Sequence, residues 1–370
     1  MSYPTTHDHL NAELDRVDAM LSAFDSAAET PVVDTESTPD SECLVQDPEQ
    51  LPLALDAESR QQISEMTTEI NHRCENTDET RLRLRVLAEV CGLSRRHLDV
   101  LMLAVAPALD EEFHTTYQRV HDRKSLSKFT VLLVEELFGR TRNEQLAAGV
   151  LIGNDSPLRR HDLIEFQPSP DKYLDERGRL ITVPDRIIDY LKGYDGVDPE
   201  LKATLADHST TQDTALTKRE ATTTLSELTL GDDIADRLAS CAETDGSQRY
   251  YWYGPPGTEK HRAVETLCPA DHYLKADLRA VLNAGVLEWL GREAALLGRP
   301  LHFTHATAAV TNHGGTNTTL DSVFTALSEL DVDVFVTGSE SWTPSGATIG
   351  IDEIIEFPYP AIELRQQFWE

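Results

Sequence analysis

The sequence predicts a mixed α/β protein, with a helical first half followed by a parallel sheet. Through residues 57–193, apolar residues recur at steps of three or four, and only two short strand-like segments interrupt this helical pattern. From residue 231 onward, short apolar runs alternate with helical segments instead. Such β–α–β alternation is typical of parallel strands connected by covering helices.

The first 56 residues are assigned to an acidic N-terminal tail and linker. An amphipathic helix is expected within residues 1–30, where Leu10, Leu14, Val17 and Leu21 share one face. The proline, serine, threonine and acidic residues that follow, up to residue 56, predict a flexible linker. Two interpretations of the first helix stay open: a docking helix, and part of a solvated tail.

Residues 57–196 form the second predicted region. Its helices are expected between Ser94 and Pro107 and over residues 111–123, 129–139, 144–152 and 184–193. Strands are expected over residues 162–166 and 180–183, on either side of a turn-rich segment. Helices followed by strand, loop and strand give the order of a winged-helix domain.

A connector over residues 197–230, with a helix near 216–228, precedes the last region, residues 231–370. In that region we expect strands over 249–254, 300–306, 333–339 and 353–358. Its helices are expected over 257–267, 282–298 and 318–330.

The segment Gly254-Pro255-Pro256-Gly257-Thr258-Glu259-Lys260-His261 is the most specific chemical signal. It follows a predicted strand and opens a helix, which is the setting of a phosphate-binding P-loop. In such a loop, backbone N–H groups surround the phosphates, the lysine contacts their oxygens, and a following Ser or Thr binds Mg²⁺. The alternative is a tight strand–helix turn that persists for the fold alone, with the Lys260 stem in solvent.

These residues resemble the P-loop of AAA+ ATPases, and residues 249–370 are similar to the large subdomain of that family. The resemblance implies that the strand Leu301–Ala306 corresponds to the Walker B strand, and that Thr337 or Ser339 is the polar residue of the sensor strand. Residues 357–360 and Arg365 resemble the approach to the small helical lid, and the lid itself is absent from this sequence.

Three departures from the AAA+ pattern predict that this chain does not hydrolyse ATP. Glu259 replaces a glycine and brings a negative charge toward the phosphates, His261 replaces the Mg²⁺-binding Ser or Thr, and no carboxylate ends the Walker B strand. We therefore expect no catalytic residues and no Mg²⁺. Weak ATP binding is expected at the loop residues Gly254, Pro255, Gly257, Thr258, Glu259, Lys260 and His261.

Residues 93–193 resemble the winged-helix module of one AAA+ group, through the stretches HLDVLMLAVAPALDEEF, NDSPLRRHDLIEF and VPDRIIDYLKGYDGVDPEL. Members of that group place this module before a degenerate AAA+ module and then an intact one, and some accompany contractile injection systems. The resemblance implies that this chain is the front half of such a protein or a shortened copy.

The charge composition limits the possible partners. The chain carries 64 acidic and 33 basic residues, a net charge of −31, and only 8 of the basic residues are lysines. A surface of this kind is typical of adaptation to high salt, where ions screen self-repulsion. Residues 119–179, the least acidic part, hold 11 bases (including Arg159 and Arg160) against 10 acids, so broad binding to nucleic acid is not expected.

The remaining composition indicates a reducing cytoplasm and no metal site. The five cysteines are scattered without metal-ligand spacing, and neither a signal peptide nor an apolar membrane span is found. His302 and His305 are expected to face opposite sides of one strand, which disfavours a metal there.

Three functions remain open. The favoured one is a non-hydrolysing regulatory or scaffolding AAA+ protein whose partners are other AAA+ modules or subunits. The second is an ATPase with its active module C-terminal to this chain, and the third is a winged-helix regulator that binds DNA through the helix at 129–139.

Overall fold

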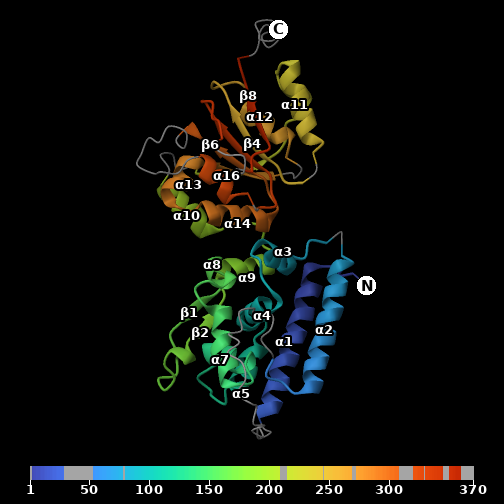
Figure 1. The fold of residues 1–370 in the computed structure, drawn as a ribbon, viewed down its shortest axis with the longest axis vertical. Helices are drawn as coiled ribbons and strands as arrows, with labels where there is room; N and C mark the ends of the chain where they lie inside the picture. Colours follow the sequence, from blue (N-terminus) through green and yellow to red (C-terminus); the bar gives the residue numbers. More distant parts are fainter. Residues whose placement is uncertain are drawn as a thin grey trace. The chain divides into compact units, whose positions relative to one another are not determined.

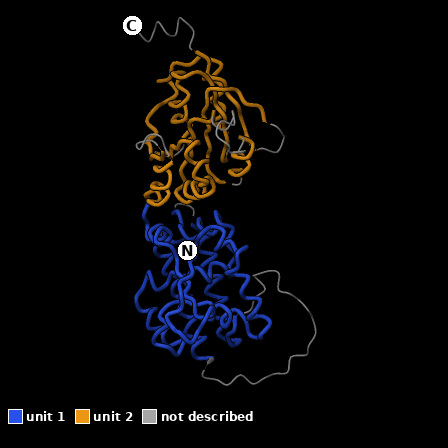
Figure 2. Tube along the Cα trace, turned by 90° about the vertical axis from the view of Figure 1, so that its left-hand side faces the viewer, with its two compact units in different colours: residues 1–195 blue, residues 196–370 orange. Residues whose placement is uncertain are grey.

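The computed structural model describes residues 2–28, 53–77, 80–208, 215–244, 246–268, 272–307, 320–328, 330–344 and 350–359. The chain separates into two compact units, residues 1–195 and 196–370 (Figure 2). Most of the expected linker over residues 29–56 lies outside the described residues, as does Arg365.

Unit 1 (residues 1–195) is helical, with one small hairpin (Figure 1). Its helices are α1 Thr6–Ala28, α2 Ala57–Glu75, α3 Arg83–Val90, α4 Arg95–Leu109, α5 Glu112–Val120, α6 Val131–Leu137, α7 Arg142–Ala148, α8 Pro157–Arg160 and α9 Asp185–Leu191. The antiparallel strands β1 Glu165–Gln167 and β2 Leu180–Thr182 pair with Phe166 opposite Ile181. The helical segments followed by this hairpin agree with the winged-helix order predicted from the sequence.

Helix α1 belongs to the core of unit 1, as the docking interpretation proposed. It lies against α2, α4 and α5, and its residues Val17, Met20 and Leu21 are fully buried. A solvated tail would leave these apolar side chains in water, which the packed helix avoids.

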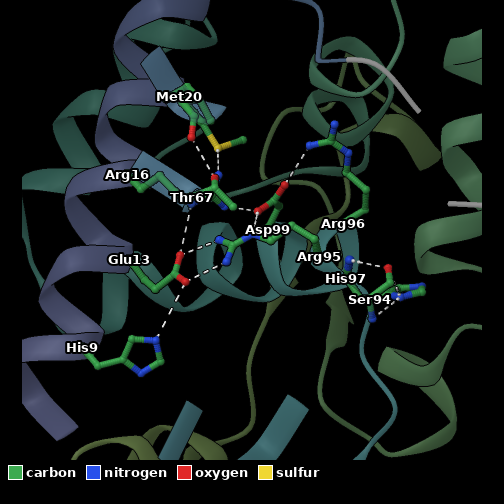
Figure 3. Close-up of polar contacts among 11 residues, drawn as sticks. His9, Glu13, Arg16, Met20, Thr67, Ser94, Arg95, Arg96, His97 and Asp99 are labelled. Carbon is green, nitrogen blue, oxygen red and sulfur yellow. Dashed lines mark hydrogen bonds and ion pairs between the residues drawn. The ribbon is translucent and has the colours of Figure 1, made fainter. Parts of the chain in front are cut away.

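A network of buried charges also joins α1 to α4 (Figure 3). Arg16 of α1 pairs with Asp99 of α4, and Glu13 of α1 accepts hydrogen bonds from Arg95 Nη1 and Nη2 at 2.7 and 2.5 Å. Arg95 and Arg96 also contact Asp99, which has no exposed surface. Burial alone would raise the pKa of Glu13, but Arg95 and Arg16 lower it to about 2.

Pro107 does not end α4, contrary to the expectation from the sequence. The helix continues to Leu109 with the proline inside it. A proline lacks the N–H that would bond the carbonyl four residues earlier, here that of Leu103. The Tyr117 hydroxyl of α5 donates to this carbonyl at 2.7 Å, so tertiary packing replaces the missing helical bond.

Unit 2 (residues 196–370) is built on a six-stranded sheet. Its strands are β3 Leu216–Glu220, β4 Arg249–Tyr253, β5 His272–Asp277, β6 Leu301–Thr304, β7 Val334–Gly338 and β8 Glu353–Glu356. The order is β3-β5-β6-β7-β4-β8, with β3 antiparallel to β5 and the remaining pairs parallel.

Helices cover both faces of this sheet. They are α10 Pro199–Asp207, α11 Asp232–Ala242, α12 Lys260–Thr266, α13 Leu278–Ala284, α14 Leu287–Leu297 and α16 Leu320–Ala326. Residues of α11 and α12 pack with Tyr250, Trp252 and Phe335 on one face. Tyr251 points to the other face, where its ring meets Trp342, which in turn stacks on Phe324 of α16.

Two expectations for unit 2 were wrong, and strand β5 was missed. Residues 216–220 form strand β3 rather than a helix, because they pair in register with β5, which the sequence did not predict. The expected helix over residues 282–298 is divided at Gly285, whose φ of +68° ends α13. Helix α13 therefore starts earlier, at Leu278, where the Asp277 side chain accepts from the Arg279 N–H as an N-cap.

Candidate functional site

The turn from β4 into α12 carries residues 254–261, which we call the glycine loop. Gly254 has a φ of +149°, and a Cβ at this position would lie 2.1 Å from the carbonyl oxygen of Phe357. Only glycine therefore fits where the chain leaves β4 beside the segment that follows β8. The loop thus begins at the carboxyl end of the strand, beside the ends of β7 and β8.

Lys260 closes the loop on itself. Its ammonium donates to the carbonyl oxygens of Gly254 and Pro255 at 2.8 and 2.9 Å, and Thr258 Oγ1 donates to the latter at 2.9 Å. Only 4% of Lys260 is exposed, and this burial lowers its pKa. The expectation of a Lys260 stem in solvent is therefore wrong, while the alternative of a turn kept for the fold alone stays open.

The side chain of Glu259 is turned away from the loop interior. Its carboxylate accepts hydrogen bonds from the Thr229 N–H at 2.9 Å and from Arg262 Nη1 at 3.2 Å. The negative charge is thus held by other groups, in contrast to the expectation that it would face the phosphates. The backbone of Glu259 is left-handed, with φ of +59°, a conformation that a glycine would adopt without strain.

His261 belongs to a polar cluster between α12 and the sheet. Its Nδ1 lies 3.3 Å from Thr337 Oγ1 and 3.4 Å from His302 Nε2, and His302 Nε2 lies 3.0 Å from the same hydroxyl. The Thr337 hydroxyl donates to the Phe303 carbonyl at 3.1 Å, so its lone pairs accept from the imidazoles. Burial lowers the pKa of His261 to about 4 and that of the fully buried His302 well below its ordinary value.

The end of β6 carries Thr304 and His305 where the AAA+ pattern has acids. Thr304 Oγ1 donates to the Ala276 carbonyl at 3.3 Å, and His305 Nδ1 lies 3.3 Å from Asp277 Oδ2 at the end of β5. Asp277 also accepts from the Arg279 N–H at 2.9 Å. The carboxylate nearest to this strand end is therefore already bonded to a helix N-terminus and to a histidine.

A cavity of about 420 Å³ opens along the carboxyl ends of these strands, and we call it the basic cleft. Its described lining carries basic side chains and hydroxyls but no carboxylate. The basic ones are Arg219, Lys260, His261, Lys275 and His305. Burial keeps His261 neutral near pH 7, so the cations are Arg219, Lys260 and Lys275. In a chain with a net charge of −31, these three cations favour an anion at this site.

Two of these cations were missed by the sequence analysis. Arg219 lies on β3 and Lys275 on β5, and Lys275 pairs directly with Thr217, another cleft residue. Burial and the neighbouring Arg219 lower the pKa of Lys275. Of the predicted loop residues, only Lys260 and His261 line the cleft, together with Pro256.

The polar residues expected at the end of the sensor strand also reach the cleft. Thr337 and Ser339 both line it, with Gly338 between them. Ser339 Oγ lies 2.9 Å from Thr307 Oγ1, and Thr337 is bonded in the histidine cluster. The loop, the end of β6 and the end of β7 therefore meet at one site, as the strand assignment from the sequence requires.

The helical unit defines a known class of domain. The family model of a winged helix domain, in its variant form, matches residues 1–205. This match covers more than half of the 370 residues, so the chain belongs to this winged-helix family. It includes α1 and α2, in agreement with their packing in unit 1.

The curated proteins contain no match to this chain. Among the described helices, none has the length and apolar character needed to cross a membrane.

Proposed function

We propose that unit 2 binds the phosphate chain of ATP through Lys260 and does not hydrolyse it, as a regulatory or scaffolding module of the AAA+ type. One observation carries this proposal: the Lys260 ammonium lies in a cleft of about 420 Å³ whose described lining has five basic side chains and no carboxylate. Lys260 now donates to two loop carbonyls, and phosphate oxygens would replace them as acceptors.

The sheet supports the AAA+ assignment. The glycine loop follows β4, which lies between β7 and β8, and β7 separates β4 from the Walker-B-like strand β6. The strands β8, β4, β7, β6 and β5 are all parallel, as expected from the β–α–β alternation of this AAA+-like region. Ligands of open α/β sheets bind at the carboxyl ends of the strands, which is where the cleft lies.

The same residues argue against hydrolysis. A working site needs a group that holds Mg²⁺ and one that orients the attacking water. The imidazole of His261 is bonded to Thr337, and Thr304 and His305 supply no carboxylate. Proteins usually hold Mg²⁺ through one or two carboxylates together with the substrate phosphates. The described lining has hydroxyls but no carboxylate, so it suits a phosphate chain better than the metal.

For unit 1 we propose protein partners rather than DNA. Two arginines between strands β1 and β2, the wing of this fold, already have carboxylate partners. Arg177 contacts Glu135 at 2.7 Å, and Arg179 contacts Glu176 at 3.0 Å. Helix α6, the expected reading helix, carries Glu135 and Glu136 and no basic residue. A DNA-binding surface would instead present lysine and arginine side chains without carboxylate partners to the DNA phosphates.

Nucleotide binding is tested by titrating the whole chain with a fluorescent ATP analogue in multimolar KCl. The wild type is expected to bind, and Lys260→Ala is expected to lose about tenfold or more in affinity, since one charge-assisted contact is removed. Lys218→Ala is the matched control, because Lys218 lies on β3 but does not line the cleft.

Either of two results would reject the proposal. Wild-type protein that does not bind the analogue leaves the glycine loop as a purely structural turn. Equal affinities of the Lys260→Ala and Lys218→Ala variants would place the nucleotide elsewhere on the molecule.

A further inference from the structure

The basic cleft extends well beyond the glycine loop. Lys260 lies at one side, whereas Arg219 and Lys275 come from the antiparallel pair β3–β5 at the edge of the sheet. In the ladder, Thr217 lies opposite Lys275 and Arg219 opposite Tyr273, so these side chains share one face of the sheet. The adjacent strand β6 continues that face with His302, which pairs with Lys275.

The cations at this edge have no ion-pair partner within the described part of the chain. Neither Lys275 nor Arg219 contacts a carboxylate there. The charge of Glu265 in α12 raises the pKa of Lys275, against the larger lowering by burial. The Glu265 carboxylate already accepts hydrogen bonds from the Thr223 N–H and hydroxyl and from the Tyr273 hydroxyl. Lys275 is half-buried and Arg219 is exposed. A half-buried cation without an ion-pair partner is costly, and a bound anion would remove that cost for Lys275.

A polyphosphate chain needs its charge neutralised when it enters such a cleft. In a working P-loop site, Mg²⁺ does much of this, held by a Ser or Thr hydroxyl and an acid. Here His261 and the pair Thr304–His305 occupy those positions, while two additional cations stand on the strands beyond them. The cleft therefore offers protein cations, and no carboxylate in its described lining, for neutralising a phosphate chain.

We infer that the basic cleft binds a polyphosphate chain in its Mg²⁺-free form, with Lys275 and Arg219 neutralising the charge that the metal would otherwise carry. This inference rests on the proposed function and adds the ionic form of its ligand. Metal-free ATP presents more negative charge than its Mg²⁺ complex, and only the former offers all its phosphate oxygens to the three cations. A Mg²⁺ ion would bring a like charge beside Lys275 and Arg219.

The test measures the affinity of the full chain for ATP, in EDTA and with excess Mg²⁺, at constant multimolar KCl. Binding is expected to be tighter in EDTA. Lys275→Gln and Arg219→Gln are each expected to weaken binding in EDTA about tenfold, since each removes one charge-assisted contact. Lys218→Gln makes the same charge change on the same strand, outside the cleft lining, and should leave the affinity unchanged.

Inorganic tripolyphosphate distinguishes the phosphate chain from the nucleoside as the recognised part. In EDTA it is expected to displace a fluorescent ATP analogue from the wild type. Failure of this displacement would overturn the inference, because recognition would then depend on the base or sugar.

The failure of this inference is distinct from the failure of nucleotide binding itself. The metal-free site is refuted if wild-type ATP binding depends on Lys260 but requires Mg²⁺, or if the Lys275→Gln and Arg219→Gln variants bind like Lys218→Gln. Binding of ATP through Lys260 stands in both cases. If the wild type binds ATP in neither buffer, both are refuted.

Discussion

Glu259 shows how one substitution can be accommodated in a glycine loop. The residue keeps the left-handed backbone, with φ of +59°, and its carboxylate is directed to the Thr229 N–H. This hydrogen bond, which glycine cannot make, partly offsets the cost of the left-handed backbone. From the sequence alone, only the strain and the charge could be anticipated, because Thr229 is distant along the chain.

A matched pair of variants isolates the backbone strain at this residue. Glu259→Gly and Glu259→Ala both lose the carboxylate, but only glycine adopts a positive φ freely. The glycine variant is expected to be more stable than the alanine variant by about 1 kcal/mol. Urea unfolding followed by tryptophan fluorescence measures this, since all four tryptophans lie in unit 2. An alanine variant at least as stable as the glycine variant would contradict the assigned conformation.

His302 makes the stability of unit 2 depend on pH. Its pKa in the folded state is far below the ordinary 6.5, so below that pH the unfolded state takes up a proton that the folded state excludes. The free energy of unfolding should therefore fall with decreasing pH, by up to about 1.4 kcal/mol for each pH unit below the ordinary pKa. Unfolding of the wild type at a series of pH values measures this slope.

The comparison with His302→Gln assigns the slope to this residue. Glutamine does not titrate, so the pH dependence between about pH 6.5 and pH 5 should be weaker in this variant. Substitution of the exposed His208 by glutamine should leave the slope unchanged. If the free energy of unfolding of His302→Gln fell with pH as steeply as that of the wild type, His302 would not be the buried neutral imidazole described here.

At the scale of elements, the docking of α1 depends on charges as well as on apolar contacts. Asp99 of α4 is fully buried and contacts Arg16, Arg95 and Arg96. Asp99→Asn leaves these guanidinium groups without their anion and is expected to destabilise unit 1 by about 3–5 kcal/mol. Asp18→Asn, on the exposed side of α1, is expected to change the stability by no more than about 0.5 kcal/mol.

Helical circular dichroism follows the unfolding of both units, while tryptophan fluorescence reports unit 2 alone. The Asp99→Asn variant should therefore lose dichroism at lower urea than the wild type, with its fluorescence transition unchanged. Equal effects of Asp99→Asn and Asp18→Asn would show that the buried network does not hold α1 in place.

The elements that the sequence predicted are those with local signals. The glycine loop, the strand before it, the buried strand β7 and the helix capped by Ser94 all carry a cap, a turn or an apolar run. The elements it missed depend on distant partners. Strand β3 is polar and is held by its ladder with β5, and α4 passes Pro107 because Tyr117 bonds the freed carbonyl.

The same distinction explains what was missed at the site. Lys260 and His261 were found because they belong to one contiguous motif. Arg219 and Lys275 lie 41 and 15 residues from Lys260 and reach the cleft only through the pairing of β3 with β5. The direction of the Glu259 side chain likewise depends on Thr229, which no local pattern brings near the loop.

At the scale of the whole molecule, the cleft is a basic site in a strongly acidic chain. With a net charge of −31, the surface repels polyanions in dilute buffer, and salt screens that repulsion along with the attraction in the cleft. A polyphosphate would therefore gain from direct contacts within the cleft rather than from the field of the protein. The chain would thus pair its winged-helix domain with a module that, as we propose, holds a phosphate chain without cleaving it.

The most direct test of this account measures phosphate release from labelled ATP, with the protein in excess over a concentration shown to saturate binding, with and without Mg²⁺. The account predicts that bound ATP is recovered intact in both conditions, because the end of β6 offers Thr304 and His305 in place of acids. Mg²⁺-dependent release of phosphate that disappears in Lys260→Ala would contradict it and make this chain an active ATPase.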